Sequence, residues 1–127
     1  MAGTDSRPFF LNLIKIRLPI TGVVSIFHRL SGVALFLAIP WSVYLLELSL
    51  RGDKGFEAVL NHLDQLFVKL ILLILVLSLI HHFFAGIRFL LTDFDIGLGK
   101  QQSKNTAWLV IALEIIVSIL IIVGVCI

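Results

Sequence analysis

Charged residues divide the chain into three long apolar runs. No charge lies between Arg29 and Glu47, a stretch of 17 residues, or between Lys69 and Arg88, a stretch of 18. Residues 107–127 form a third run of 21 residues with a single charge. About 20 predominantly apolar residues of α-helix cross the hydrocarbon core of a bilayer, so each run predicts a transmembrane helix. The predicted spans cover about residues 21–48, 66–90 and 107–127.

Composition extends this prediction to the whole chain. Of its 127 residues, 59% are hydrophobic and only 14% are charged, with a mean hydropathy of +1.09. Soluble domains are closer to half apolar and a quarter charged. We therefore expect an all-α membrane protein, in which residues 1–20 precede a three-helix membrane anchor formed by residues 21–127. A single cysteine, Cys126, excludes a disulfide within the chain and a C-x-x-C-H haem attachment.

Basic residues are distributed unevenly about the predicted spans. Four Lys or Arg residues precede or open the first span, three lie in or beside the first loop, and three lie in or beside the second loop. Acidic residues balance those of the first loop, and no basic residue follows the third span. Cytoplasmic loops carry an excess of Lys and Arg. We therefore expect the amino terminus and the second loop in the cytoplasm and the carboxyl terminus outside.

Two prolines and a mixed segment mark the first span. Residues 9–22, FFLNLIKIRLPITG, combine bulky apolar side chains with Lys15 and Arg17. This mixture fits a segment lying along the cytoplasmic interface, and it fits an irregular basic leader equally well. Pro19 favours the first turn of a helix and so predicts where the span opens. Pro40 predicts a kink within it.

A first polar cluster lies at the start of the first span, in VVSIFHRLSG, residues 23–32. Ser25, Arg29 and Gly32 follow i, i+4, i+7 spacing and share a helix face, with His28 beside them. An ionisable side chain within a span indicates a functional site. The alternative is that Arg29 extends to the lipid headgroups while Ser25 bonds its own helix backbone.

A second polar cluster lies in SLIHHFFAGIRFLLTD, residues 78–93. Ser78, His82 and Gly86 are spaced i, i+4, i+8, so small residues flank an imidazole and leave room for a flat molecule. A neutral imidazole inside a bilayer needs a hydrogen bond, a proton path or a metal, and haem iron is the natural metal candidate. The alternative is a hydrogen bond to a neighbouring helix or close helix packing, which we favour for His81, about 100° away.

The two clusters are predicted to meet. The first span leaves the cytoplasmic side and the second span returns to it, so both clusters are expected in the same leaflet. A hydroxyl, two guanidiniums and two imidazoles would then form one polar pocket facing the cytoplasm. The side chains concerned are Ser25, His28, Arg29, His82 and Arg88.

Both clusters resemble motifs of a known family, the cytochrome b556 subunits of succinate dehydrogenase. SIFHRLSG resembles the motif S-x-x-H-R-x-[ST]-G, and HFFAGIRFLLTD resembles H-x-x-x-G-[IV]-R-x-L-x-x-D. The resemblance covers nearly the whole chain, including IRLPITGVVSI, three spans and a short charged second loop. It implies one of the two membrane anchor subunits of respiratory complex II, which together form a heterodimeric helix bundle in the cell inner membrane.

The resemblance also implies a role for each matching residue. His82 takes the position of an axial ligand to haem b iron, whose other axial histidine would come from the second anchor subunit. His28 matches a histidine near the haem propionates, and Arg88 is expected to contact a propionate or a lipid headgroup. Ser25 and Arg29 match residues of the ubiquinone site, where they would hydrogen-bond or polarise a quinone carbonyl.

In the enzyme that this resemblance implies, other subunits carry the first steps. A flavoprotein with FAD would oxidise succinate, and iron–sulfur clusters of a further subunit would pass electrons to ubiquinone. This chain has no phosphate-binding glycine loop and no cluster-binding cysteines, so it is expected to be a non-flavin subunit that cannot oxidise succinate alone. Its expected partners are these subunits and the bilayer, and not a nucleic acid.

Two residues stand outside this assignment. Phe89 occupies a position where some relatives carry a second histidine, which leaves the propionate surroundings less polar without removing His82. Glu114, in the third span, is expected to have a structural role, paired with a neighbouring helix or with Lys104, rather than to conduct protons.

Three alternative functions stand beside the main one. A non-redox membrane scaffold would use its buried histidines only to pack helices. A transporter would need a polar site at the midplane, and the sequence shows neither a broken-helix pair nor a repeat. A fumarate reductase anchor would carry similar motifs and run the reaction in reverse.

Overall fold

Four helices follow one another in the computed structural model, which describes residues 18–126, and this range contains no strand. Three of the helices are long and apolar enough to cross a membrane, which confirms the predicted all-α membrane fold. The helices are α1 (Ile20–Ser49), α2 (Asp53–Leu63), α3 (Leu66–Asp93) and α4 (Lys100–Cys126).

The observed long helices follow the predicted spans closely, with one extension. The first two predicted spans agree with α1 and α3 to within three residues at each end. α4 begins at Lys100, seven residues before the predicted start, because the polar residues 100–106 continue the helix beyond the apolar run. Lys and Gln are good helix formers, and water at a membrane interface can solvate them. The segment expected along the interface, residues 9–22, lies mostly outside the described residues.

α2 is an element that the sequence analysis missed. It occupies most of the first loop between α1 and α3. Its apolar residues follow the i, i+3, i+4, i+7 spacing of an amphipathic helix, which was the available signal. These residues are Phe56, Val59, Leu60 and Leu63.

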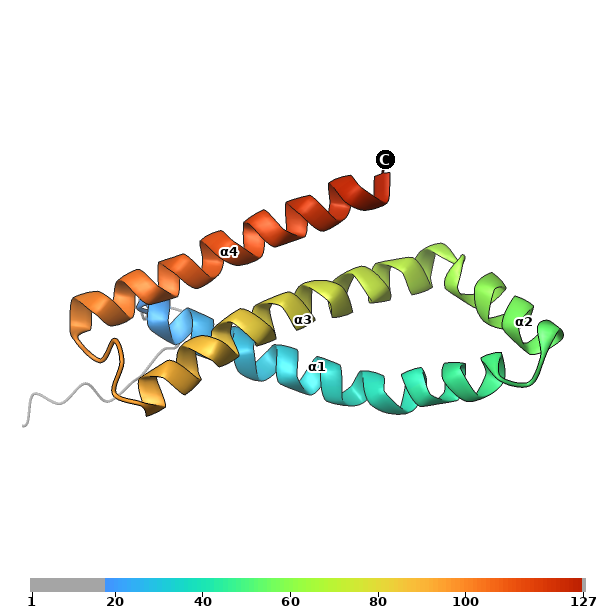
Figure 1. Ribbon diagram of the computed structural model, residues 1–127, viewed down its shortest axis with the longest axis horizontal. Helices are drawn as coiled ribbons and strands as arrows, with labels where there is room; N and C mark the ends of the chain where they lie inside the picture. Colours follow the sequence, from blue (N-terminus) through green and yellow to red (C-terminus); the bar gives the residue numbers. More distant parts are fainter. Residues whose placement is uncertain (1–17, 127) are drawn as a thin grey trace, which may run out of the picture.

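The helices form a long hairpin with one additional helix alongside (Figure 1). α1 and α3 run antiparallel beside each other, and α2 joins them at one end of the molecule. α4 returns along α3 from the opposite end. The start of α1, the end of α3 and the start of α4 therefore gather at the same end, far from α2.

Two prolines shape α1. Pro19 is the N-cap, in an extended conformation with φ −63° and ψ 152°, as expected for a residue that opens the span. Pro40 lies inside the helix, which continues for nine residues beyond it. At about 1.5 Å per residue, the 30 residues of α1 extend about 45 Å, which exceeds the roughly 30 Å hydrocarbon core of a bilayer.

The buried core of the described residues is small and lies where α1, α3 and α4 meet. Ala85 and Ala107 have no exposed surface, and Val24 is 1% exposed. Small side chains allow helix backbones to approach closely, as membrane helices commonly do. Most large apolar side chains point outward and are exposed. A surface of this kind suits lipid tails or partner helices.

An exposed ion pair and a closely packed glycine lie at the end that carries α2. Lys69 bonds to Asp64 at 2.6 Å, which lowers the pKa of the Asp64 carboxyl. Gly55 is buried against the end of α1, where a Cβ atom at this position would overlap the backbone carbonyl of Leu48. Only glycine allows α2 to pack this closely on α1.

We predict that Gly55→Ala moves α2 away from α1 and destabilises this end of the protein by about 1–3 kcal/mol, the usual cost of an overpacked site. The measurement is the thermal stability of the purified protein. Glu57→Ala, at an exposed position of the same helix, is the control. Equal stability of the two variants would contradict the packing inferred for Gly55.

Candidate functional site

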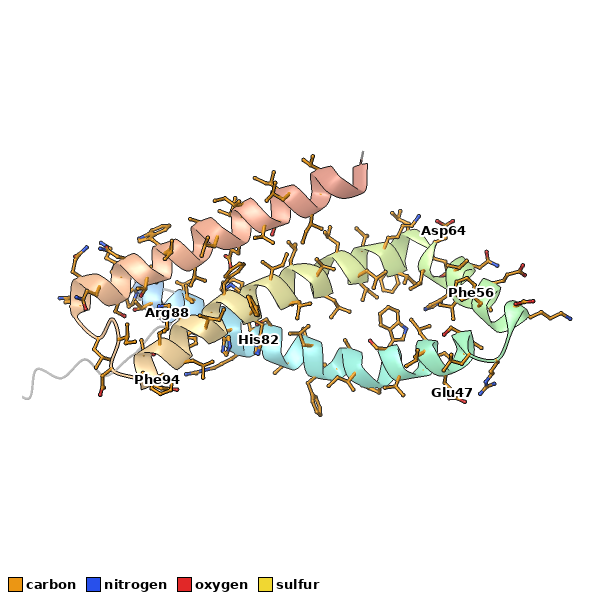
Figure 2. The ribbon with its side chains drawn as sticks, viewed as in Figure 1. Glu47, Phe56, Asp64, His82, Arg88 and Phe94 are labelled. Carbon is orange, nitrogen blue, oxygen red and sulfur yellow. The ribbon has the colours of Figure 1, made fainter. Side chains whose placement is uncertain are left out.

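The histidines of the two polar clusters meet between α1 and α3, as the sequence predicts, whereas the prediction that Arg88 shares their pocket is wrong, because it bonds to α4. The rings of His28 and His82 are stacked, with centroids 4.1 Å apart and planes inclined by 8°. His82 lies between α3 and α1 in Figure 2. Phe89 packs edge-on against His28 at 5.1 Å, so the apolar ring at this position supports one of the histidines. The pair therefore occupies one level of the helix bundle.

Hydrogen bonds fix the tautomer of His82. Its Nδ1 lies 3.2 Å from the backbone carbonyl oxygen of His28 and 3.2 Å from the hydroxyl of Ser31. A carbonyl only accepts hydrogen bonds, so Nδ1 carries the proton and donates it. Ser31 in turn donates to the same carbonyl at 2.9 Å. Nε2 is left with its lone pair and no hydrogen bond to any residue in the range 18–126.

Glycines on both helices make room for the stacked pair. A Cβ atom at Gly32 would lie 3.1 Å from Cε1 of His82, closer than the ring tolerates without moving. A Cβ atom at Gly86 would lie 3.5 Å from Nε2 of His28. Each glycine thus makes room for the histidine of the facing helix. The sequence pattern suggested instead that Gly86 leaves space beside His82, which lies on the same helix as Gly86.

Ser25 and Arg29 lie on the face of α1 that adjoins His82. They share this face with Gly32 through i, i+4, i+7 spacing, and Gly32 contacts the His82 ring. Ser25 is half-buried and Arg29 is exposed. A hydroxyl and a guanidinium therefore share the face of α1 on which Gly32 adjoins the His82 ring.

Arg88 lies apart from this pair and points toward α4. Its side chain is 6% exposed. Nε donates to the hydroxyl of Thr106 at 3.1 Å, and Nη2 donates to the hydroxyl and the carbonyl of Ser103 at 2.9 and 3.2 Å. The guanidinium also lies 5.2 Å from the centre of the Phe89 ring. Arg88 therefore ties α3 to α4, and Nη1 is the donor group that bonds to no residue in the part of the chain that the structure describes.

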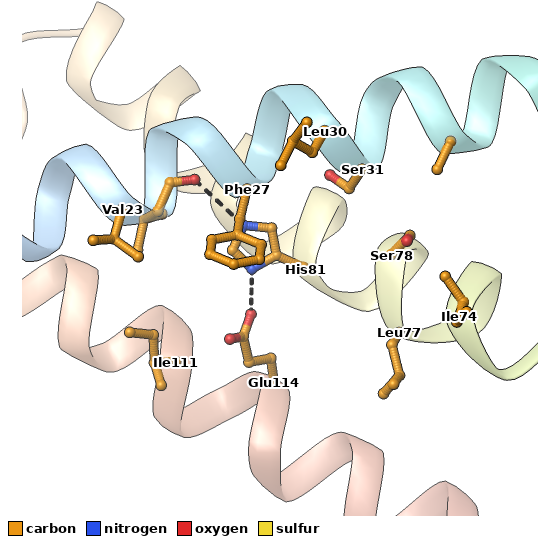
Figure 3. Close-up of a pocket in the computed structure, with 12 residues that line it drawn as sticks. Val23, Phe27, Leu30, Ser31, Ile74, Leu77, Ser78, His81, Ile111 and Glu114 are labelled. Atoms are coloured by element: carbon orange, nitrogen blue, oxygen red, sulfur yellow. Dashed lines mark hydrogen bonds and ion pairs between the residues drawn. The ribbon is translucent and has the colours of Figure 1, made fainter. Parts of the chain in front are cut away.

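His81 connects three helices, which confirms the interpretation that it bonds a neighbouring helix. Its Nδ1 lies 2.6 Å from the carboxylate of Glu114 on α4, and its Nε2 lies 3.3 Å from the carbonyl of Val24 on α1. Figure 3 shows the imidazole between these two partners. Both ring nitrogens are engaged, so His81 has none free for a metal. Glu114 pairs with a neighbouring helix, α3, which was one of the two arrangements expected from the sequence.

A cavity of about 600 Å³ opens beside this bridge. Side chains from α1, α3 and α4 line it, and most of them are apolar (Figure 3). Ser31, which bonds His82, lies on one wall, and the His81–Glu114 pair lies on another. The cavity therefore borders the same level of the bundle as the paired histidines, and Arg29 is not among its lining residues.

Several residues of the site were not assigned a role from the sequence. Ser31 falls at the [ST] position of the first motif and three residues after His28, which was the available signal. Ser103 and Thr106 precede the predicted third span, so hydropathy gave no reason to place them beside Arg88. The carbonyl of Val24 has no sequence signature at all.

The fold and the site together define a helical membrane subunit with an imidazole pair between two antiparallel spans. Residues 3–121 match the family described as succinate dehydrogenase/fumarate reductase transmembrane subunit. The chain belongs to this family, and it is therefore a membrane subunit of a succinate dehydrogenase or fumarate reductase complex.

Relatives support the same assignment over nearly the full length. The succinate dehydrogenase cytochrome b556 subunit of Coxiella burnetii is 33% identical over 119 residues, which cover 90% of this chain and 92% of the relative. That of Rickettsia felis is 29% identical over 117 residues, covering 92% and 91%. The succinate dehydrogenase cytochrome b560 subunit of Reclinomonas americana is 27% identical over 120 residues, covering 91% and 83%.

We predict that Arg88→Met loosens the contact between α3 and α4, because it removes the charged donor that Ser103 and Thr106 share. Hydrogen bonds to charged groups contribute roughly 1.5–3 kcal/mol each, so the thermal midpoint of the purified complex should fall by several degrees. Arg51→Met removes an exposed arginine that pairs with Glu47, and it should leave the midpoint unchanged. A stable Arg88→Met complex would contradict the structural role.

Proposed function

We propose that this chain anchors a succinate dehydrogenase in the cell inner membrane, binds haem b through His82, and helps to form the ubiquinone-reduction site. The observation that carries the haem assignment is the hydrogen bond from Nδ1 of His82 to the carbonyl of His28. It leaves the lone pair of Nε2 available, and a backbone carbonyl on Nδ1 is a common way to orient a ligating imidazole.

The residues around His82 fit a haem. Imidazole is a standard axial ligand of haem iron, and the porphyrin is largely apolar, as is this part of the bundle. The stacked His28 ring and the closely packed Gly32 restrict the rotation of the His82 ring. Bound haem b supplies a centre that is reduced and oxidised by one electron at a time.

The remaining ligands of this haem are assigned by the same proposal. The names of the relatives include cytochromes b556 and b560, which supports a b-type haem here. His28 stacks on His82 instead of facing it, so it would not supply a second iron ligand, and the proposal assigns that ligand to a histidine of the second anchor subunit. His28 is proposed to lie near the propionates. Nη1 of Arg88 is the group proposed to contact a propionate, because the other donors of Arg88 already bond to α4.

We predict that His82→Leu abolishes or strongly weakens the low-spin bis-histidine absorbance of the purified complex, because Leu cannot bind iron. His62→Leu is the matched control, since His62 lies on α2 at the opposite end of the molecule. Its spectrum should equal that of the wild type. An unchanged spectrum in His82→Leu would show that another residue binds the iron.

The face that carries Ser25 and Arg29 is proposed to bind the quinone headgroup. Reduction of ubiquinone to ubiquinol adds two electrons and two protons, and negative charge develops on a quinone oxygen as electrons arrive. The Arg29 guanidinium stabilises this charge, and Ser25 donates a hydrogen bond to the same oxygen. The exposed position of Arg29 leaves it free to reach a ligand that enters from the bilayer.

Electrons reach this site from other subunits. The chain has a single cysteine and no phosphate-binding glycine loop, so the FAD of the flavoprotein and the clusters of the iron–sulfur subunit lie outside it. The end of the bundle where α1 begins and α3 ends is proposed to face the cytoplasm, where the positive-inside rule places its Lys and Arg residues. Quinone at this end is close to water and to a docked iron–sulfur subunit.

We predict that Ser25→Ala and Arg29→Leu lower succinate-dependent ubiquinone reduction about 100-fold, the lower end of the range for loss of a stabilising donor. Succinate oxidation with an artificial electron acceptor should survive, because it does not use this site. Lys104→Leu, which removes an exposed cation of α4 from the same end, is the control. If both activities fall equally, or if neither falls, the quinone assignment is wrong.

Two other functions are distinguished by the same measurements. A fumarate reductase anchor fits the family description, but the relatives described above are named as succinate dehydrogenase subunits, which favours succinate oxidation. A scaffold without a redox role would carry no haem and would not respond to quinone-site inhibitors. The free lone pair on Nε2 of His82 argues against it, since a histidine that only packs helices has no need of one.

A further inference from the structure

The proposed function does not use the bridge formed by Glu114, His81 and the carbonyl of Val24. This bridge is largely buried, with side-chain exposures of 15% for His81 and 22% for Glu114. It connects α1, α3 and α4 at a single level (Figure 3). His81 also immediately precedes His82 in the chain.

Consecutive histidines of α3 bond to successive turns of α1. Nε2 of His81 bonds to the carbonyl of Val24, and Nδ1 of His82 bonds to the carbonyl of His28. These carbonyls are four residues apart and so lie one above the other on α1. Consecutive residues of a helix point about 100° apart, so rotation of α3 about its axis would carry one ring toward α1 and the other away from it. The two bonds can form together only at one rotational setting of α3.

Glu114 fixes this setting from a third helix. Its carboxylate, on α4, bonds to Nδ1 of His81 at 2.6 Å. Arg88, two turns further along α3, bonds to Ser103 and Thr106 of α4. These contacts set the register of the antiparallel α3 and α4, and the Glu114 contact lies at the turn of α3 that carries His82.

We propose that Glu114 is a positioning residue for His82. Through His81 it holds the rotation of α3 that would direct Nε2 of His82 toward the haem iron. The proposal rests on the proposed function, since it concerns the orientation of a haem ligand. It assigns Glu114 an effect on the bound haem in addition to its contribution to helix packing.

Three variants of the purified complex separate positioning from stability. In Glu114→Gln the amide can donate to Nδ1 while Nε2–H of His81 still donates to Val24, so the bridge is kept. Glu114→Leu has a similar size but forms no hydrogen bond. The double variant His81→Phe with Glu114→Leu removes the bridge and leaves no buried polar group unpaired, so it should assemble even if Glu114→Leu alone does not. Glu47→Gln, at the far end of α1, is the control.

The readouts are the g-values and the midpoint potential of the haem, together with haem content and the thermal midpoint of the complex. We expect Glu114→Gln and Glu47→Gln to match the wild type. We expect Glu114→Leu and the double variant to shift the largest g-value of the haem and to release haem several-fold more readily in detergent. We expect the double variant to keep a near-normal thermal midpoint. Such a shift at normal stability shows an effect on ligand orientation.

Two results would overturn the proposal. One is a wild-type haem spectrum and potential in the assembled double variant, which would leave the bridge with a packing role only. The other is an equal shift in Glu114→Gln and Glu114→Leu, which would point to the charge of Glu114 instead of its hydrogen bond. Failure of the proposed function is recognised separately, because His82→Leu would then leave the haem spectrum unchanged.

Discussion

The structure depends on one constraint, that a polar group within a bilayer must find its hydrogen-bond partner inside the protein. Two adjacent histidines of α3 meet this requirement in different ways. His81 uses both ring nitrogens, on Glu114 and on the carbonyl of Val24. Among the described residues, 18–126, His82 uses only Nδ1, on the carbonyl of His28 and on Ser31. One imidazole is thereby fully committed to helix packing, and the other keeps one nitrogen available for chemistry.

Close packing makes these hydrogen bonds attainable. Side chains as short as imidazole reach a neighbouring helix's backbone only where the helix axes approach closely. Gly32 permits this approach at the His82 ring, and the fully buried Ala85 and Ala107 permit it between α3 and its neighbours. The small residues of this chain thus serve the polar site, and substitution by larger residues would separate the helices and break the hydrogen bonds.

The outer surface shows how this subunit fits into a larger assembly. Most of its large apolar side chains are exposed, which suits lipid and partner helices alike. α4 covers one side of the α1–α3 pair, and Ser25 and Arg29 are not among the residues that line the cavity on that side. Membership of a family of complex subunits explains why a chain of this size buries so little of its own surface.

The sequence by itself determined the helical class, the positions of two spans to within three residues, and the meeting of His28 with His82. These features follow from the length and order of the apolar runs. The sequence also predicted, from a position about 100° away from His82, that His81 bonds a neighbouring helix. It did not show that Arg88 faces α4 or that Ser31 bonds His82, and it missed α2. Those features depend on which helix faces which and at what rotation, and packing of the whole bundle decides that, because hydropathy is nearly uniform around a membrane helix.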